Sequence, residues 1–370
     1  MAPVSDDVAD AAQTAVNRLR APSLQPSDFF KQSDVVRGLF AKLIGVDDPS
    51  RIAIVPSVSY AMAALARNTT IRPGENVVVV HEQFPSNVYT WKRICEENGA
   101  ELRSVRSPRM SDSRGAAWNR ALLNAIDETT ALVTIPELHW ADGTRFDLET
   151  IGARARGCGA RFILDGTQSV GALPFHVAQG QPDAVVCAGY KWLMGPYSIG
   201  IAYFGPAYDG GIPLEENWIT RLGSEDFSGL VRYSDEYHPG AIRYDMGERS
   251  NFILLPMLEA GLAQVTAWGP AAIQDYCRRL CADAVEELRQ LGCWVEDDDR
   301  RAAHLFGVRL PAGFDLDAMQ TALSERGVSI SVRGSAIRVS PHVYNDAGDL
   351  AALVGAVRAV IDPRRDKLVQ

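Results

Sequence analysis

Two oppositely charged side chains stand at the ends of two short apolar segments in the middle of the sequence. Phe162–Leu164 is followed by Asp165, and Ala184–Cys187 runs through a glycine and a tyrosine into Lys191. Apolar runs of this length, bounded by glycine and polar residues, predict buried strands. Ligands of open α/β sheets bind beyond the carboxyl ends of the strands, so we expect this carboxylate and this amine to face one ligand.

A lysine at the end of a buried strand is suited to covalent chemistry with an aldehyde, because burial lowers the pKa of the amine and makes it a nucleophile. Pyridoxal phosphate is such an aldehyde, and it needs a carboxylate near its ring nitrogen to keep that nitrogen protonated. Lys191 and Asp165 match these two needs. The alternative is an ordinary strand-end aspartate beside a solvated lysine, which neither residue alone excludes.

The elements that must position these residues alternate between strand and helix. Continuous apolar strands separated by helical patterns predict a mostly parallel sheet covered on both faces, and therefore an α/β fold. Besides the two strands above, the predicted strands are 52–55, 76–80, 132–135, 200–204, 305–310 and 337–339, and the predicted helices are 8–19, 35–44, 59–67, 87–98, 118–126, 252–268, 271–291, 316–326 and 347–361.

These elements predict three parts. Residues 1–45 form an N-terminal helical segment, residues 46–250 a large α/β domain, and residues 251–370 a smaller α+β domain. The stretch before the second boundary is irregular and polar, which favours a change of domain there.

Two motifs around the charged pair resemble those of a known family. Asp165-Gly-Thr-Gln168 matches a D-G-x-Q strand end, and the seven residues from Tyr190 to Pro196 match a pattern H-K-x-x-x-G-P. Together they resemble the class V aminotransferase family of fold-type I pyridoxal-phosphate enzymes, which includes cysteine desulfurases, kynureninases and isopenicillin N epimerase-like proteins. The resemblance covers nearly the whole chain, and it implies an amino-acid substrate and a homodimer with shared active sites.

The resemblance implies a binding site for the phosphate and the ring of the cofactor. Ser57, Val58 and Ser59 lie between a predicted strand and helix, where backbone N–H groups at a helix N-terminus bind phosphate, although the two serines also suit ordinary helix caps. Phe84 is expected to cover the pyridine ring, with burial in the core as the alternative. Gln168 is expected to bind the phenolic oxygen, and Tyr190 stands where many relatives have histidine.

Two residues are expected to contact the substrate. His139 follows the strand at 132–135, and the resemblance places its turn near the substrate and the phenolic oxygen; a histidine satisfied by the backbone is the alternative. Arg338 lies in the region that resembles the carboxylate-binding part of the family, and its planar guanidinium suits a carboxylate. A strand arginine paired with a surface aspartate is the alternative there. Arg333 is a weaker candidate for the same role.

Three further residues are expected, through the resemblance, to reach the active site of the partner subunit. Ser250 and Asn251 occupy the turn that contacts the partner's phosphate in relatives, although Glu248 beside them would repel a phosphate. Trp218 is included by analogy with kynureninase. The first residues resemble only the tail of a motif that forms one wall of the substrate pocket. We therefore expect either that the true start lies upstream of Met1 or that this protein lacks that wall.

Composition limits the classes of partner and location. The net charge is −9 and the chain has no basic run, which argues against nucleic-acid binding. No apolar stretch is long enough for a membrane helix and no signal pattern begins the chain, so we expect a soluble cytoplasmic protein. Six cysteines are scattered without C-x-x-C pairs, and no metal site is predicted.

These features predict a pyridoxal-phosphate enzyme acting on an amino acid, with Lys191, Asp165 and His139 as catalytic residues. Transamination or β-elimination of the C–S lyase type is favoured; epimerisation, kynureninase-like cleavage and a non-catalytic cofactor-binding protein are the alternatives. Desulfurases carry a nucleophilic cysteine just before the substrate-binding arginine, whereas no cysteine lies between Arg333 and Arg338. Cysteine desulfuration is therefore disfavoured.

Overall fold

The computed structural model describes residues 2–20, 23–109, 114–311, 313–314, 316–333 and 336–361. Contacts divide the chain into two compact units. Unit 1 contains residues 1–106, 120–137 and 147–269, and unit 2 contains residues 107–119, 138–146 and 270–370. This division differs from the predicted boundary near residue 250, because the last helix of unit 1 packs against the two N-terminal helices and two internal segments join the C-terminal part.

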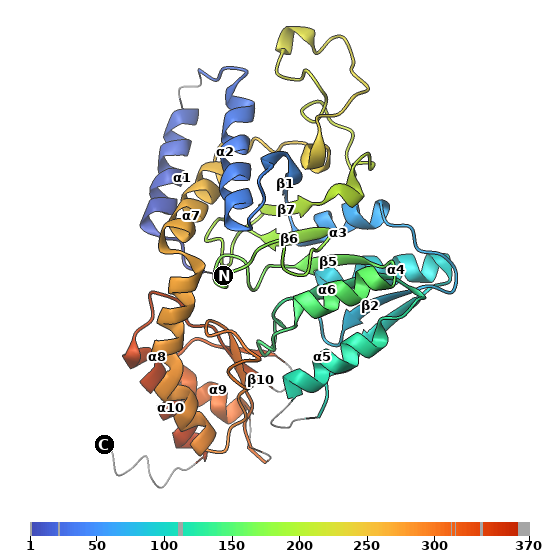
Figure 1. The fold of residues 1–370 in the computed structure, drawn as a ribbon. Coiled ribbons are helices and arrows are strands. Elements are labelled where there is room, and N and C mark those ends of the chain that lie inside the picture. The colour runs from blue at the N-terminus through green and yellow to red at the C-terminus, as the bar shows by residue number, and fades with distance from the viewer. Residues whose placement is uncertain are drawn as a thin grey trace. The chain divides into compact units, whose positions relative to one another are not determined.

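Unit 1 is built on a seven-stranded sheet of order β1-β7-β6-β5-β4-β2-β3 (Figure 1). Strand β7 is antiparallel to both of its neighbours, β1 and β6. The other pairs are parallel, so all the strands except β7 run in the same direction. The carboxyl ends of the parallel strands therefore lie at one edge. The strands are β1 (Ile52–Val55), β2 (Asn76–Val80), β3 (Glu101–Val105), β4 (Thr130–Pro136), β5 (Arg161–Asp165), β6 (Ala184–Ala188) and β7 (Gly200–Phe204).

Helices cover this sheet. The strands β1, β2, β5, β6 and β7 are buried almost throughout, as expected for a sheet enclosed on both faces. Helix α5 begins in unit 2 and ends in unit 1. The helices of this part of the chain are α1 (Asp6–Leu19), α2 (Asp28–Leu43), α3 (Val58–Arg67), α4 (Tyr89–Asn98), α5 (Arg114–Ala125), α6 (Leu148–Gly157) and α7 (Leu254–Trp268).

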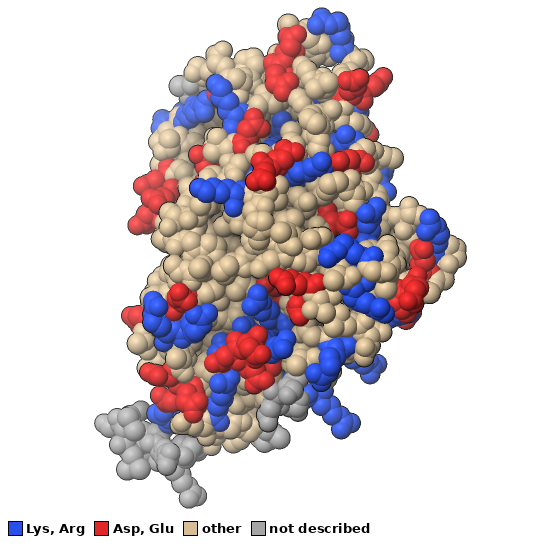
Figure 2. All heavy atoms as spheres, in the orientation of Figure 1, with Lys and Arg blue, Asp and Glu red and all other residues tan. Residues whose placement is uncertain are grey.

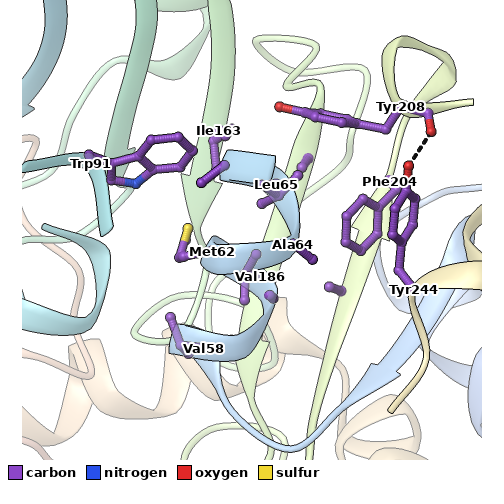
Figure 3. Packing of buried hydrophobic residues seen from close by; sticks show 14 of the residues in the cluster. Val58, Met62, Ala64, Leu65, Trp91, Ile163, Val186, Phe204, Tyr208 and Tyr244 are labelled. Carbon is purple, nitrogen blue, oxygen red and sulfur yellow. Dashed lines mark hydrogen bonds between the residues drawn. The ribbon is translucent and has the colours of Figure 1, made fainter. Parts of the chain in front are cut away.

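One buried hydrophobic cluster of unit 1 lies between α3 and the sheet (Figure 3). Met62 and Leu65 of α3 pack with strand residues such as Val186, and all three are fully buried. Phe204 stacks on Tyr244 with ring centroids 4.3 Å apart, and the Tyr244 hydroxyl donates to the carbonyl of Tyr208. This packing fixes the start of α3, which follows directly on the carboxyl end of β1.

A buried cluster of charges ties α2 to β1 and to the segment before α7. Asp245 is fully buried, its Oδ1 accepts from the backbone N–H of Ile54 at 2.7 Å, and its carboxylate pairs with Arg37 and Arg249. The Arg249 side chain lies 2.6 Å from Asp245 Oδ2, and burial lowers the pKa of its guanidinium. The carboxylate thus holds two buried cations.

Removal of this carboxylate is expected to destabilise unit 1 strongly. Asp245→Ala would leave Arg37 and Arg249 buried without their counter-ion, which typically costs about 3–5 kcal/mol. Chemical denaturation of the variant should show this loss in the free energy of unfolding. The matched control is Glu97→Ala, which removes an exposed glutamate of α4 that lies 3.4 Å from Arg93 and should cost less than about 1 kcal/mol. Equal losses would contradict the role of Asp245.

Unit 2 combines a three-stranded sheet with helices. Strand β10 (Ala336–Val339) lies between β8 (Phe306–Val308) and β9 (Ser331–Arg333), antiparallel to both. Its helices, besides the first turn of α5, are α8 (Pro270–Gln290), α9 (Leu316–Glu325) and α10 (Ala347–Ile361), and they pack around a core that includes Phe306 and Ile337. This arrangement of strands and helices agrees with the α+β character predicted for the C-terminal part.

Charged side chains are mixed on the molecular surface. Figure 2 shows acidic and basic residues interspersed over the face in view, which fits a chain of modest net negative charge. Among the residues described, no helix has both the length and the apolar character that a membrane crossing requires. The described part of the chain also holds no group of three or more His, Cys, Asp or Glu side chains arranged for a metal ion.

Candidate active site

Asp165 is the last residue of β5 and is almost completely buried. Strands β5 and β6 are hydrogen-bonded neighbours, with Asp165 opposite Val186, so the prediction that the aspartate and the lysine follow adjacent strands is confirmed. Asp165 Oδ1 accepts from the backbone N–H of Thr167 at 3.0 Å. Burial raises the pKa of the Asp165 carboxyl, although the hydrogen bonds from Thr167 and the charge of Lys191 oppose that rise.

Lys191 lies between aromatic rings just past the end of β6. Its Nζ is 5.4 Å from the ring centroid of Phe84 and 5.8 Å from that of Tyr190. Phe84 is half-buried, so it does not belong to the closed core that was its alternative. Tyr190 also packs against Tyr197, with ring centroids 4.6 Å apart. The amine therefore lies close to the rings of Phe84 and Tyr190, which can attract its charged form.

The loops around Lys191 contain unusual backbone conformations. Glu82, Met194 and Ser198 have positive φ values of 55°, 55° and 65°, although none is glycine. Such residues cost free energy and persist where the surrounding structure fixes them, which is common at functional sites. They belong to the loop that carries Phe84 and to the loop that follows Lys191. Both loops lie at the carboxyl edge of the sheet.

The turn after β1 presents a helix N-terminus to the same edge. Ser57 is the N-cap of α3, and its Oγ accepts from the backbone N–H of Tyr60 at 3.2 Å. The hydroxyls of Ser57 and Ser59 are 2.9 Å apart, and Ser59 is exposed whereas Val58 packs into the core. Because its side chain is buried, Val58 could contact a phosphate only through its backbone N–H, which adds to the N–H groups and hydroxyls of the neighbouring serines and to the dipole of the helix.

Gln168 is buried two residues beyond Gly166, in the turn that begins at Asp165. The hydroxyl of Thr167, next to it, accepts from the backbone N–H of Ala188 at 3.2 Å and so ties this turn to the end of β6. Hydrogen bonds through Thr167 therefore connect Asp165 to Ala188, the last residue of β6, three residues before Lys191.

The three residues expected at a partner's site have local contacts in this chain. The ring of Trp218 lies 6.1 Å from that of Phe29, and the Ser250 hydroxyl donates to the Phe29 carbonyl. Asn251 Oδ1 accepts from the N–H of Leu254 at 2.8 Å, which caps α7. Trp218 remains 39% exposed, which leaves part of its indole available to another molecule. The side chains of Ser250 and Asn251 thus already have partners that shape the fold.

Both candidates for substrate contact belong to unit 2. His139 is buried in segment 138–146, which follows β4 in sequence but joins unit 2. Arg338 lies in β10, and its Nη1 donates to the carbonyl of Trp140 at 3.2 Å. The side chain of Arg333 lies outside the described part of the structure. His139 and Arg338 are therefore held in one unit and joined through one loop.

Sequence reasoning missed two features near these residues. The first is the pairing of the Asp142 carboxylate with His139, three residues earlier in the sequence. The short spacing of the histidine and the aspartate in the stretch H-W-A-D-G-T could have indicated this pair. The backbone N–H of Ala2 donates to the carbonyl of Tyr190 at 3.2 Å, so the N-terminal segment lies beside the residue that precedes Lys191. The first residues were expected to resemble the tail of a motif that forms one wall of the substrate pocket, but the contact with Tyr190 was not predicted.

The sequence matches the family "Aminotransferase class-V" over residues 11–361. The chain belongs to this family. It is therefore an enzyme of the pyridoxal-phosphate-dependent class V group, as the motifs around Asp165 and Lys191 predict.

Relatives and solved structures cover nearly the full chain. The uncharacterized aminotransferase YcbU of Bacillus subtilis is 25% identical over 361 residues, covering 96% of this chain and 91% of that protein. Isopenicillin N epimerase of Streptomyces clavuligerus is 24% identical, covering 88% of this chain and 83% of that protein. The cystine C–S lyase C-DES, solved in complex with its product cysteine persulfide, superposes with a TM-score of 0.83 at 18% identity, covering 97% of this chain and 94% of that one. The predicted fold class is confirmed.

The residues described fit the cofactor. A protonated ring nitrogen beside Asp165 would stabilise the ionised form of this carboxyl, whose pKa burial raises. Phe84 offers a half-buried aromatic ring 5.4 Å from the amine of Lys191, and α3 offers a capped N-terminus. Asp165 and Phe84 thus fit the ring of the cofactor, Lys191 fits its aldehyde, and the N-terminus of α3 fits its phosphate.

Proposed function

We propose that this enzyme removes the α-proton of an amino acid and then either eliminates a sulfur substituent from the β-carbon or transfers the amino group. The observation that carries the proposal is the placement of buried Asp165 and of Lys191 at the ends of paired strands, with Phe84 beside the lysine amine. Bound pyridoxal phosphate supplies an electron sink for the bond that is broken at the α-carbon.

The residues of unit 1 are assigned to the cofactor. Lys191 Nζ would bind the aldehyde and afterwards accept the α-proton, which requires a neutral amine at that atom. Asp165 would hold a proton on the ring nitrogen, and Gln168 would donate to the phenolic oxygen. Phe84 and Tyr190 would exclude water from the ring, while the N–H groups of 57–59 would bind the phosphate.

The residues of unit 2 are assigned to the substrate. Arg338 would bind the α-carboxylate through its guanidinium, and this interaction orients the α-proton. His139 would donate to the phenolic oxygen or assist proton transfer, as the sequence predicted. The contact of Arg338 with the carbonyl of Trp140 supports a joint role, because it links the two side chains through one loop.

The cysteines support the argument against desulfuration. Five of the six are buried, and burial raises the thiol pKa of Cys95, Cys281 and Cys293 to about 11 and that of Cys277 to about 12. Cys187 is buried too, and its pKa is likewise raised. A persulfide-forming cysteine needs an accessible thiolate, which a raised pKa disfavours. Cys158, the half-exposed one, lies at the end of α6.

The two favoured reactions differ in what leaves the enzyme. Elimination from an S-substituted cysteine consumes one water and yields pyruvate, ammonia and a thiol, and it needs no protein nucleophile. Transamination yields a keto acid and leaves the amino group on the cofactor, so a second keto acid is required for another turnover. The relation to C-DES, which is a cystine C–S lyase, favours elimination; the relation to YcbU, which is named an aminotransferase, favours amino transfer.

A single-turnover experiment with S-methyl-L-cysteine decides between them. Elimination is expected to release about one methanethiol per active site, with no conversion of the cofactor to its amino form; transamination gives the opposite result. Alkylation of the cysteines with iodoacetamide should leave either rate within about threefold, because no thiol takes part. Persulfide formation on a cysteine from free L-cysteine would contradict both reactions. No α-proton exchange with any amino acid would favour a non-catalytic cofactor-binding protein.

We also propose a homodimer in which Trp218, Ser250 and Asn251 approach the partner's cofactor. The exposed part of the Trp218 indole supports this for one of the three. The hydroxyl of Ser250 donates to the Phe29 carbonyl, so it would have to give up this hydrogen bond in order to donate to a phosphate.

A further inference from the structure

The loop that carries His139 lies on a buried cluster of charges in unit 2. The cluster comprises Arg114 of α5, Asp142 of the loop itself, Glu296, and Arg309 after β8. The side chains of Arg114, Asp142 and Glu296 are each no more than 2% exposed. Charges buried to this extent are costly unless they are paired, so the arrangement of the cluster requires an explanation.

Asp142 is the centre of the cluster. Its Oδ2 lies 2.9 Å from Arg114 Nη2 and 3.2 Å from Arg309 Nη2. Its Oδ1 accepts from the Thr144 hydroxyl at 2.9 Å and lies 3.3 Å from Nδ1 of His139. Burial alone would raise the pKa of Asp142, but the opposite charges of His139, Arg114 and Arg309 hold it below its usual range, so the carboxylate is ionised.

The imidazole of His139 is held between this carboxylate and an indole. The ring centroids of His139 and Trp118 are 5.0 Å apart, and the guanidinium of Arg114 lies 4.9 Å from the Trp118 ring. The backbone of the loop is fixed as well, because the N–H of His139 donates to the Thr144 carbonyl at 2.9 Å and the N–H of Gly143 donates to the His139 carbonyl at 2.8 Å. The ring therefore has one carboxylate at Nδ1 and little freedom to rotate.

Gly143 explains how the loop comes so close to the rest of unit 2. Its φ is +74°, and a Cβ at this position would lie 2.2 Å from the carbonyl oxygen of Leu305. The N–H of Gly307 in β8 donates to the carbonyl of Asp142 at 2.8 Å. The loop is thus seated on β8 through backbone contacts, which fixes Asp142 independently of His139.

We propose that Asp142 is a positioning residue that acts through His139. An ionised carboxylate at Nδ1 favours the tautomer with the proton on Nδ1 and leaves Nε2, on the opposite side of the ring, as the basic nitrogen. Nε2 is then the atom that receives or returns a proton during the reaction, and the carboxylate stabilises the imidazolium that forms. This inference rests on the proposed role of His139.

Two arginines contact the oxygen of Asp142 that does not face His139. Arg114 and Arg309 both form ion pairs with Oδ2 of Asp142. The carboxylate of Glu296 lies 3.5 Å from Nη1 of Arg114 and partly offsets the positive charge of that arginine. The interactions with His139, Arg114 and Arg309 together lower the pKa of the Asp142 carboxyl. Its second oxygen is committed to the two arginines, so Oδ1 is the atom that faces the imidazole.

A double-mutant cycle in the holoenzyme tests the proposal, with α-proton exchange of L-alanine and S-methyl-L-cysteine in D2O as the probe. His139→Gln is expected to lower kcat about 10²-fold and Asp142→Asn about 10- to 100-fold, with smaller changes in KM. If Asp142 acts through His139, the double variant has the kcat of His139→Gln alone. Independent, multiplying effects would overturn the positioning role. Unchanged exchange in His139→Gln would instead overturn the proposed role of His139.

A control and a direct observation separate positioning from stability. Arg309→Gln removes an ion pair from Oδ2 of Asp142 but leaves the contact with His139, so exchange should stay within about threefold even if the thermal midpoint falls. ¹⁵N NMR of histidine-labelled holoenzyme, with the signal of His139 assigned from His139→Gln, should show the Nδ1–H tautomer. The Nε2–H tautomer in the wild-type protein would overturn the proposal even if Asp142→Asn does not fold.

Discussion

Lys191→Ala is expected to abolish the covalent attachment of pyridoxal phosphate. The chain has only five lysines, Lys31, Lys42, Lys92, Lys191 and Lys367, and Lys191 alone follows a buried strand of the sheet. Its amine lies 5.4 Å from the centroid of the Phe84 ring, which was expected to cover the pyridine ring of the cofactor. Turnover should fall by at least about 10²–10⁴-fold, the range that one proton-transferring group contributes.

Borohydride reduction followed by peptide mapping measures this result. Wild-type enzyme should carry the reduced cofactor on the peptide that contains Lys191, and the variant should carry none after denaturation. The matched control is Lys92→Ala, which removes an exposed lysine of α4 that lies 3.7 Å from Glu96. The control should retain both the adduct and the activity. An adduct on any of the other four lysines would contradict the assignment.

Asp165→Asn is expected to separate cofactor retention from turnover. The variant keeps Lys191 and should still bind the cofactor covalently, but a neutral amide cannot hold the ring nitrogen in its protonated form. We expect kcat to fall by about 10²–10³-fold or more, the cost of removing one preorganised electrostatic group. Asp183→Asn is the matched control, because Asp183 precedes β6 at the opposite edge and accepts from the N–H of Phe162 at 2.8 Å.

The same substitution should stabilise the protein without cofactor, with a defined pH dependence. Burial raises the pKa of Asp165 in the folded state above its unfolded value. Below the unfolded pKa both states are protonated and the carboxyl causes no loss of stability. As pH rises from the unfolded pKa to the raised folded pKa, the unfolded state ionises while the native state keeps its proton, so the native state loses stability, and this loss is complete above the folded pKa. The free energy of unfolding of Asp165→Asn should therefore exceed that of the wild type at neutral pH and match it near pH 3. A constant difference at all pH values would contradict this cause.

Most of the fold followed from apolar periodicity, and the exceptions have physical causes. The strands from β4 to β7 and the helices from α7 to α10 lie within a few residues of their predicted bounds. Strand β3 was missed because it is at the edge of the sheet, where Glu101–Val105 needs little burial and carries charged residues. Helix α6 was missed because arginines and glycines interrupt its apolar pattern.

The site was predictable where chemistry and strand ends coincide, as they do at Asp165 and Lys191. It was not predictable where the partner is distant in sequence. Nothing near Asp142 signals that Arg309 will lie 3.2 Å from its carboxylate, since only the fold brings them together. For the same reason, the sequence did not indicate that segment 138–146 joins the C-terminal unit, because a loop between two strands of one sheet is expected to stay with that sheet.

Three stretches of each unit alternate along the chain, so the polypeptide passes between the units five times. A ribosome delivers this chain from its N-terminus, and the first 269 residues emerge before the helices and strands of residues 270–370 exist. Arg114 and Asp142 are then translated well ahead of Glu296 and Arg309, with which they are buried in the finished protein. Vectorial synthesis can complete the sheet of unit 1 early, but the loop that carries His139 must wait for the last hundred residues. A nascent chain stalled near residue 269 should therefore protect unit 1 from protease while segments 107–119 and 138–146 remain open to cleavage.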